Sequence, residues 1–382
     1  MSTAPSLRTP PSLRFLAGVF LLGWMLVALF PLVWIAVQSV RLPVDAFSSN
    51  PFTVLRAPGT LAAEGGVSVL GLLGVIAIGG GLIYWLRRHG SDVAYRVAGP
   101  RRVRGWLAVL AMAAVALVIG VWVLQVIPLG APAIGLTFAH YRQVWIADGF
   151  HHQFLNSMLV TGGVVTISLS VGTLAAYGFA RTRTRLAFWL LIIALVFRAM
   201  PHSVLVAGYL PVFISSREWL TPLWQFPLFS LISADPPTLY GKPWAVIVVL
   251  VAINQPFTIW LLRSFFASIP AELDEAAAVD GCTPFGAFRR VIMPVMWPGV
   301  ITAGLFSFLL AYNDYIVAAL LLDAQSQTMV PTISQYINSE TNAGDQLRAV
   351  AAAVSITAPL FLLIMAFQRN IVSGLVQGAV KG

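Results

Sequence analysis

Long apolar runs separated by short polar segments dominate the chain. Eight of these runs are long enough to cross a bilayer as helices, which requires about 20 residues each. They cover residues 15–40, 67–86, 105–127, 154–180, 186–214, 244–262, 299–322 and 348–367. The pattern predicts an all-α polytopic membrane protein with eight transmembrane helices, the fifth of them broken near Pro201 and Pro211.

The composition supports this fold class. Hydrophobic residues make up 58% of the 382 residues and charged residues only 10%, whereas globular domains carry about 25% charge. The formal net charge of +9 is compatible with nucleic-acid binding. However, the basic residues are spread through loops beside the apolar runs, where they determine topology.

The distribution of lysine and arginine predicts the orientation. An even number of spans places both termini on one side of the membrane, and most of the 23 basic residues lie on that side. They include the arginines of segments 87–104 and 181–185. Since cytoplasmic loops are enriched in these residues, we expect both termini to be cytoplasmic. The first run lacks a small-residue cleavage site, so we expect a retained helix rather than a signal peptide.

Several kinds of chemistry are excluded by motifs that the sequence lacks. The single cysteine, Cys282, excludes an intramolecular disulfide and a cysteine-rich metal site. There is no GxxxxGK[ST] phosphate loop, so any ATP must be hydrolysed by another chain. Neither HExxH nor GxSxG occurs. We therefore expect no catalytic residue and no metal site.

The stretch 269–298 lies between the sixth and seventh runs and predicts two short helices. Acidic residues at Glu272, Asp274 and Glu275 suit the first turn of a helix that continues to Val279. Gly281 supplies the left-handed residue that ends it, and a proline three residues later prevents its continuation.

A second short helix is expected over residues 285–292. Phe285, Phe288 and Ile292 recur at helical spacing on one side, with Arg289 and Arg290 between them. Two short helices joined by a sharp bend present a surface suited to docking a partner. The alternative is an ordinary amphipathic cytoplasmic loop.

The same residues carry a family resemblance. Glu275-Ala276-Ala277 is followed after three residues by Gly281, and after nine more by Val291-Ile292-Met293-Pro294. This spacing resembles the EAA motif of the permease subunits of bacterial ABC importers, with Val and Met replacing Ile and Leu. The surrounding string AVDGCTPFGAFRRVIMP is similar to carbohydrate permeases of the maltose (MalG-like) kind. By resemblance, residues 263–298 form a coupling loop, and an ATPase docks on the motif positions Glu275, Ala276, Ala277, Asp280, Gly281 and Pro294.

The resemblance covers the first run and everything from about residue 136 onward, including TLAAYGFAR, AYNDYIVAALLL and FQRNIVSGLVQGAVKG. It implies a division into residues 1–49 (tail and first helix), 50–135 (an inserted two-helix hairpin) and 136–382 (the permease core, ending in the tail 368–382). The family usually has six spans, so the hairpin is an addition that preserves the orientation of all later spans. It either packs laterally against the bundle or lipid, or contacts another subunit.

The resemblance also implies the partners. They are a second homologous permease, two copies of an ATPase that bind ATP and Mg²⁺, and an extracytoplasmic solute-binding protein, in a bacterial inner membrane. The chain itself needs no cofactor.

Polar residues inside the apolar runs are candidates for a solute pathway, because such groups are costly in a membrane and a solute stripped of water needs hydrogen-bond partners. They are Asn313, Asp314, Tyr315, Asn254, Gln255 and Arg198. An alternative is structural: Arg198 and Asp314 pair with each other or with a partner chain, and Asn254 bonds a carbonyl freed by Pro256.

A rival function is an ion- or proton-coupled secondary transporter of a polar solute. It explains the intramembrane polar groups but leaves the Glu-Ala-Ala stretch without a role.

Overall fold

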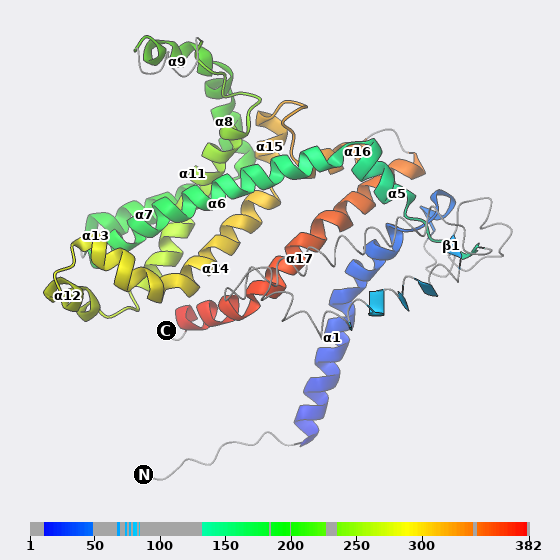
Figure 1. Cartoon of the computed structure of the whole chain (residues 1–382), viewed down its shortest axis with the longest axis horizontal. Coiled ribbons are helices and arrows are strands. Elements are labelled where there is room, and N and C mark those ends of the chain that lie inside the picture. Colours follow the sequence, from blue (N-terminus) through cyan, green and yellow to red (C-terminus); the bar gives the residue numbers. More distant parts are fainter. Residues whose placement is uncertain are drawn as a thin grey trace. The chain divides into compact units, whose positions relative to one another are not determined.

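A computed structural model of the chain describes residues 11–48, 67–68, scattered positions between 73 and 84, and residues 132–182, 185–198, 200–226, 235–338 and 342–379. Helices form almost all of this part of the chain (Figure 1). The exception is one short antiparallel pair, β1 (Val67–Ser68) and β2 (Pro132–Ile134). The predicted all-α class is therefore right for the described residues apart from these two short strands, both within the inserted region 50–135.

Within the described residues, 5 helices are long and apolar enough to cross a membrane. They are Phe15–Gln38, Phe150–Arg181, Pro243–Phe266, Pro284–Tyr312 and Ala343–Gln368. These correspond to the predicted runs 15–40, 154–180, 244–262, 299–322 and 348–367. The predicted span 105–127 lies outside the described residues. Half of the positions of the predicted span 67–86 also lie outside them, and its start differs from the prediction, because Val67–Ser68 is a strand. The count of eight therefore stays a prediction.

The predicted fifth span is divided into two helices. α7 (Arg185–Arg198) and α8 (His202–Ile214) are separated at Pro201, whose ψ of 130° is extended. Proline has no N–H to donate and disfavours helical geometry in the residue before it, which explains a break here. The second expected break is absent, because Pro211 lies inside α8. A short amphipathic helix, α9 (Ser216–Trp224), follows.

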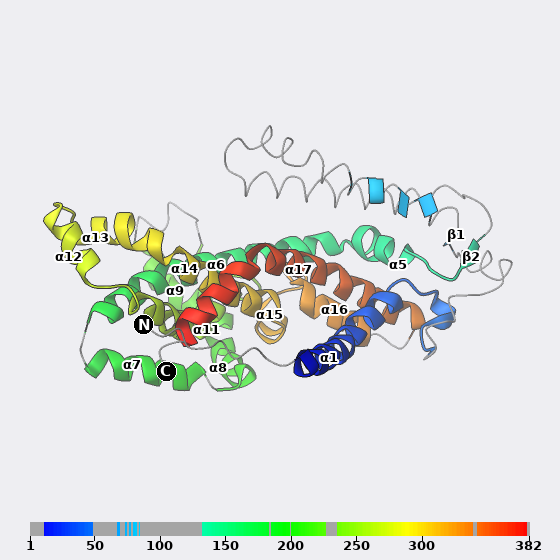
Figure 2. The same cartoon turned by 90° about the horizontal axis from the view of Figure 1, so that it is seen from below.

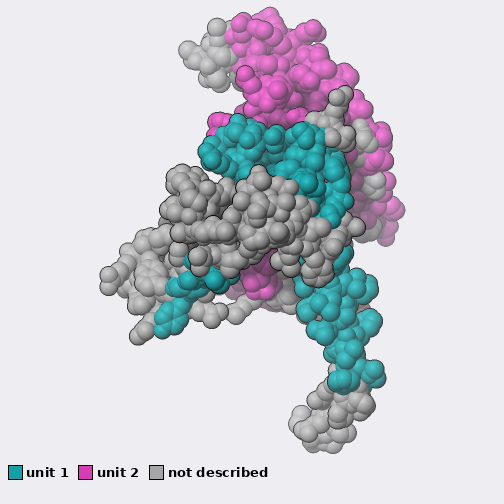
Figure 3. Space-filling model, turned by 90° about the vertical axis from the view of Figure 1, so that its right-hand side faces the viewer, with its two compact units in different colours: residues 1–148, 336–355 teal, residues 149–335, 356–382 magenta. Residues whose placement is uncertain are grey.

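The chain forms two compact units, coloured separately in Figure 3. Unit 1 contains residues 1–148 and 336–355, and unit 2 contains residues 149–335 and 356–382. α16 (Met329–Asn338) and α17 (Ala343–Ala379) contribute to both. α17 continues through most of the predicted tail 368–382, so those tail residues extend the last helix.

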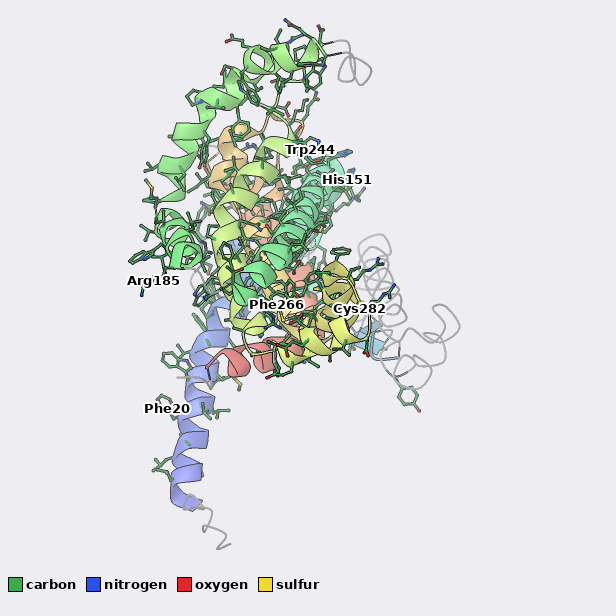
Figure 4. All side chains as sticks on the ribbon, turned by 90° about the vertical axis from the view of Figure 1, so that its left-hand side faces the viewer. Phe20, His151, Arg185, Trp244, Phe266 and Cys282 are labelled. Carbon is green, nitrogen blue, oxygen red and sulfur yellow. The ribbon has the colours of Figure 1, made fainter. Side chains whose placement is uncertain are left out.

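Unit 2 is built on three packed helices: α6 (Phe150–Arg181), α11 (Pro243–Phe266) and α14 (Met293–Tyr312). α6 and α11 run parallel. Figure 4 shows His151 and Trp244, near their starts, at one end of the bundle, and Phe266 and Cys282 at the other. Buried aliphatic side chains fill the bundle, among them Val164, Leu250 and Ile253.

Glycines bring these helices close together. A Cβ at Gly172 of α6 would lie 2.8 Å from Cγ2 of Thr258 on α11, and one at Gly299 of α14 would lie 2.9 Å from the Phe265 ring. Small residues at such points let helix backbones approach in a membrane, where packing rather than water exclusion holds helices together. The three helices therefore form a closely packed body.

The predicted seventh span differs from the structure at both ends. α14 begins at Met293, six residues before the expected start, because Pro294 occupies its first turn, where the missing N–H is tolerated. It ends at Tyr312, and a separate helix, α15 (Ile316–Leu321), follows a non-helical turn. The span is thus discontinuous at residues 313–315.

Unit 1 begins with α1 (Pro11–Gln38), whose apolar side chains are exposed, as expected of a helix that faces lipid. The turn η1 (Pro43–Asp45) follows α1. Arg41 connects the residues on the two sides of this turn. This side chain is fully buried, lies over the Trp34 ring at 5.0 Å and donates to the carbonyl of Ser48 at 2.6 Å. The short helix α5 (Ala139–Arg142) and the π-helical turn η3 (Gln143–Ala147) complete the part of this unit before α6.

Candidate functional site

The segment between α11 and α14 contains the predicted helix. α12 spans Glu272–Val279, so this prediction is confirmed, and its first turn carries Glu272, Asp274 and Glu275. Carboxylates at this position interact favourably with the free N–H groups at the start of a helix. Figures 1 and 2 both place α12 at the end of unit 2 where α14 begins.

The helix ends in a Schellman motif at Gly281. The N–H of Gly281 donates to the carbonyl of Ala278 at 3.0 Å, and the N–H of Cys282 donates to that of Ala277 at 2.9 Å. Gly281 has φ of +80°, a left-handed conformation that suits glycine, and nothing lies within 4 Å of the position of a Cβ. Gly281 therefore has the predicted role of ending α12 as a left-handed residue.

The second predicted helix is not a separate element. α13 (Pro284–Ala287) is a single turn, capped by the Thr283 hydroxyl, which accepts from the N–H of Gly286 at 3.1 Å. It continues through the π-helical turn η4 (Phe288–Ile292) directly into α14. Phe285 and Phe288 lie on one side as predicted, with ring centroids 6.2 Å apart. Phe288 is buried against Tyr177 of α6, whereas Phe285 is 63% exposed.

One side of α12 faces the bundle. The Tyr177 hydroxyl donates to Oδ1 of Asp274 at 2.6 Å, and Nη2 of Arg181 lies 2.6 Å from Oδ2 of the same carboxylate. Arg181 also donates from Nη1 to the carbonyl of Ile269, just before α12, at 3.1 Å. The end of α6 thus holds α12 through its first turn.

The opposite side of α12, which we call its outer face, consists of exposed side chains. They are Glu272, Glu275, Ala276 and Val279, and the exposed Asp280 directly follows the helix. Val279 is 88% exposed, and the exposed Phe285 follows the turn at Gly281. The carboxylates of this face can form ion pairs with basic side chains of a partner. The apolar side chains of Val279 and Phe285 can at the same time enter a hydrophobic pocket of that partner.

The predicted docking residues lie in three places. Glu275 and Ala276 lie on the outer face, Asp280 and Gly281 lie in the turn that follows, and Pro294 is exposed at the start of α14. Ala277 is buried, so it is not available to a docking partner in this structure.

A cavity of about 380 Å³ lies between the end of α11, α12 and the start of α14. Its lining is mostly apolar: Phe265, Ser268, Ile269, Pro270, Leu273, Val295, Met296, Pro298 and Gly299. α12 is thus not closely packed against α14 on this side.

The predicted pathway residues occupy different environments. Asn254 is 1% exposed, and its amide nitrogen lies 2.7 Å from Oγ of Ser307 and 3.0 Å from Oγ1 of Thr258. Its neighbour Gln255 is half-buried, and its amide nitrogen donates to the backbone carbonyl of Ser168 on α6 at 3.4 Å. Both side chains contribute to helix packing in this structure.

Arg198, at the end of α7, lies over the ring of Phe257 on α11 at 4.4 Å, a cation–π contact. Asn313, Asp314 and Tyr315 form the break between α14 and α15. The Asn313 amide donates back to the carbonyl of Leu309 at 2.9 Å, and Oδ2 of Asp314 accepts from the N–H of Ala318 at 2.9 Å. Tyr315 is exposed.

No local sequence pattern marks Tyr177, Arg181 and Asp274 as a group. A partial signal was present, because Tyr177 and Arg181 are one turn apart at the end of an apolar run and Asp274 directly precedes the motif. Their pairing joins positions 97 residues apart, which local patterns do not encode. Among the described residues, no group of three or more His, Cys, Asp or Glu side chains could hold a metal ion.

Comparison with known proteins identifies the family. Residues 168–377 match the family described as the binding-protein-dependent transport system inner membrane component, which is more than half of the chain. The chain belongs to this family. It is therefore a membrane permease subunit of an ABC importer, and a separate ATPase subunit hydrolyses ATP. The ion- or proton-coupled secondary transporter is not supported.

Two relatives of the permease are similar over most of their length. The diacetylchitobiose uptake system permease protein DasC of Streptomyces coelicolor is 33% identical over 249 residues, which cover 65% of this chain and 82% of DasC. The trehalose transport system permease protein SugB of Mycobacterium tuberculosis is 31% identical over 248 residues, which cover 65% of this chain and 83% of SugB.

A solved structure has the same fold as the permease. It is a crystal structure of a bacterial ABC transporter involved in the import of the acidic polysaccharide alginate. The match has a TM-score of 0.56 and covers 96% of this chain and 99% of that one, at 17% sequence identity. At this identity the likeness shows the fold alone.

Proposed function

We propose that this permease subunit carries a carbohydrate across the bacterial inner membrane and that the outer face of α12 is the surface on which the ATPase docks. The observation that carries the docking proposal is the exposure of Glu275 and Val279 on a helix whose other side is fixed to α6, with Asp280 exposed directly after it. A helix fixed on one side and exposed on the other is suited to transmitting force from a partner.

The substrate class rests on the relatives. DasC is named for diacetylchitobiose uptake and SugB for trehalose transport, so a sugar, polyol or glycoside is the class we propose. The pathway residues are Asn313, Asp314, Tyr315, Asn254, Gln255 and Arg198. The discontinuity at 313–315 supports the first three, because transporters commonly bind substrate where a spanning helix is interrupted.

The charge distribution supports cytoplasmic termini and a cytoplasmic coupling loop, residues 263–298. On that side α12 faces an ATPase dimer that binds ATP and Mg²⁺. A second homologous permease completes the pathway, and an extracytoplasmic solute-binding protein delivers the solute. ATP-driven closure of the ATPase dimer moves α12, and the bundle opens alternately to the two sides.

Charge reversal on the outer face tests the docking proposal. We expect Glu275→Lys to abolish ATP-dependent uptake and weaken co-purification of the ATPase, while the permease still inserts in the membrane. Glu218→Lys is the matched control, because it reverses an exposed carboxylate on α9 instead. Normal uptake and normal co-purification in Glu275→Lys would reject the docking role of this face.

The substrate proposal has its own test. The cognate solute-binding protein, assayed against neutral sugars, acidic sugars, polyols, amino acids and peptides, should bind a carbohydrate. Selective binding of an amino acid or a peptide would overturn the substrate class and leave the family assignment intact.

A further inference from the structure

We infer that Tyr177, Arg181 and Asp274 form a clamp that makes α12 move as one body with α6, so that α6 receives the motion of the docked ATPase directly. This inference rests on the proposed docking of the ATPase on α12. It assigns a positioning role to three residues that lie outside the outer face of α12.

The clamp has two arms on a single carboxylate. Oδ1 of Asp274 accepts from the Tyr177 hydroxyl, and Oδ2 lies beside the Arg181 guanidinium, both at 2.6 Å. Tyr177 and Arg181 are one helical turn apart, so they lie on the same side of α6. The hydrogen bond from Tyr177 sets the direction of the carboxylate and the ion pair with Arg181 holds its other oxygen close to α6, so together they orient the first turn of α12.

The clamp is partly shielded from solvent. The Arg181 and Asp274 side chains are 23% and 21% exposed. The Tyr177 ring packs against Phe266, at 5.6 Å between ring centroids, and against Phe288, at 5.0 Å. An ion pair in such surroundings is screened less than one at the surface, and removing one partner leaves the other charge unpaired.

Apart from the clamp, little holds α12 in place, because Ala277 is its one buried residue. It has only eight residues, which is too short for a helix to be stable alone. Non-helical residues precede it, and the exposed turn at Gly281 follows it. The cavity of about 380 Å³ lies on its side toward the start of α14, so close packing does not hold α12 there.

α6 is well placed to carry the motion onward. It packs along α11, where a Cβ at Gly163 would lie 2.7 Å from the Ile247 side chain. It also packs along α14, where a Cβ at Gly304 would lie 3.1 Å from Leu169 of α6. Because close-packed interiors transmit displacement instead of absorbing it, motion delivered to the end of α6 moves all three helices together.

The inference is tested in the complete transporter, reconstituted in vesicles with its ATPase, second permease and binding protein. The measured quantity is solute transported per ATP hydrolysed. We expect Asp274→Asn to lower this ratio by about tenfold, within the range typical of coupling between two sites, while the ATPase remains bound. Glu218→Gln, which removes an exposed carboxylate on α9 instead of α12, is the control and should keep the wild-type ratio.

Two further variants separate transmission from simple stability. Tyr177→Phe keeps the ring packing and removes one arm of the clamp, so its ratio should fall less than that of Asp274→Asn. Exchanging the charges, Arg181→Asp together with Asp274→Arg, should recover part of the ratio that either single change loses. These comparisons remain informative if Asp274→Asn reduces expression, because Tyr177→Phe preserves the hydrophobic contacts.

The outcomes distinguish this inference from the docking proposal. A wild-type ratio in both Asp274→Asn and Tyr177→Phe would overturn the clamp and leave docking intact. Loss of the ATPase from Asp274→Asn would also overturn it, since Asp274 would then act in assembly. If Glu275→Lys has no effect but the clamp variants lower the ratio, the docking surface is wrong and the connection of α12 to α6 stands.

Discussion

The amide nitrogen of Asn254 lies 2.7 Å from Oγ of Ser307, and this hydrogen bond joins α11 to α14 inside the bundle. Both side chains are buried, and Thr258 joins them through its own contact with Asn254 at 3.0 Å. Polar contacts of this kind hold helices together in membranes. The position of Asn254 therefore favours a structural role alongside the pathway role that the sequence suggested.

Asn254→Leu separates these roles. Ser307 still donates to the carbonyl of Ala303, and the Thr258 hydroxyl to the backbone carbonyl of residue 254. We therefore expect a modest loss, about 1 kcal/mol of stability, seen as a lower thermal midpoint in detergent. If Asn254 serves only to join α11 and α14, the KM for uptake should not change. A raised KM at an unchanged midpoint would instead assign Asn254 to the pathway.

The glycines of α6 provide a matched pair for helix packing. A Cβ at Gly172 would lie 2.8 Å from Cγ2 of Thr258, whereas nothing lies within 4 Å of one at Gly162. Thr258 is branched at Cβ and hydrogen-bonded, so it cannot easily turn away.

We expect Gly172→Ala to lower stability by about 1–3 kcal/mol through overpacking. Gly162→Ala should be neutral or slightly stabilising, because alanine is the better helix former. Thermal unfolding of both variants in one detergent measures the difference, and equal midpoints would contradict the close approach of α6 and α11.

Local signals explain what the sequence could predict at the coupling loop. The acids of the first turn, Gly281 and Pro284 each act on neighbouring backbone, so the bounds of α12 and the bend after it follow from residues close in the chain. Local residues do not determine which side of α12 faces the bundle. It depends on Asp274 meeting Tyr177, which is a tertiary contact and leaves no periodic pattern in either segment.

Average hydropathy likewise does not predict the break in the seventh span. Residues 299–322 read as one apolar run, because two polar residues within it barely change the average. The break arises from hydrogen bonding: Asp314 accepts from the N–H of Ala318 and so begins a new helix. Conversely, Pro201 marks a break through its backbone geometry, which is why that division could be predicted.

His140 gives unit 1 a pH dependence. Its ring is buried, and Nε2 lies 2.9 Å from the carbonyl oxygen of Arg41. Since a carbonyl only accepts, Nε2 carries the proton in this contact. Burial lowers the pKa of His140 below its ordinary value of 6.5, and the charge of Arg348 lowers it further, although the hydrogen bond to Arg41 acts in the opposite direction.

Because the pKa is lower in the folded protein, the unfolded chain binds a proton more readily. Stability is therefore fully present above pH 6.5 and decreases as the pH falls from there through the folded-state pKa. Thermal midpoints measured across this range should fall toward acid in the wild type and fall less in His140→Gln. His151→Gln, which replaces an exposed histidine, is the control. An acid response of His140→Gln identical to that of the wild type would contradict the assignment.

Asp314 combines a structural contact with a proposed role in the pathway, and two substitutions separate them. Asp314→Asn removes the charge and retains an oxygen that can accept from the N–H of Ala318. Asp314→Ala removes both, and loss of such a helix-starting contact costs about 1 kcal/mol. Both variants should keep the ATPase bound, because the break at residues 313–315 and α12 are at opposite ends of α14.

If the carboxylate serves the solute, uptake should fall by about tenfold in Asp314→Asn, a loss typical of one charged hydrogen bond. The thermal midpoint of this variant should stay at the wild-type value, and only Asp314→Ala should lose stability as well. Normal uptake by Asp314→Asn would mean that the side chain serves only to start α15. In that case the pathway proposal at this position would rest on the helix break, Asn313 and Tyr315.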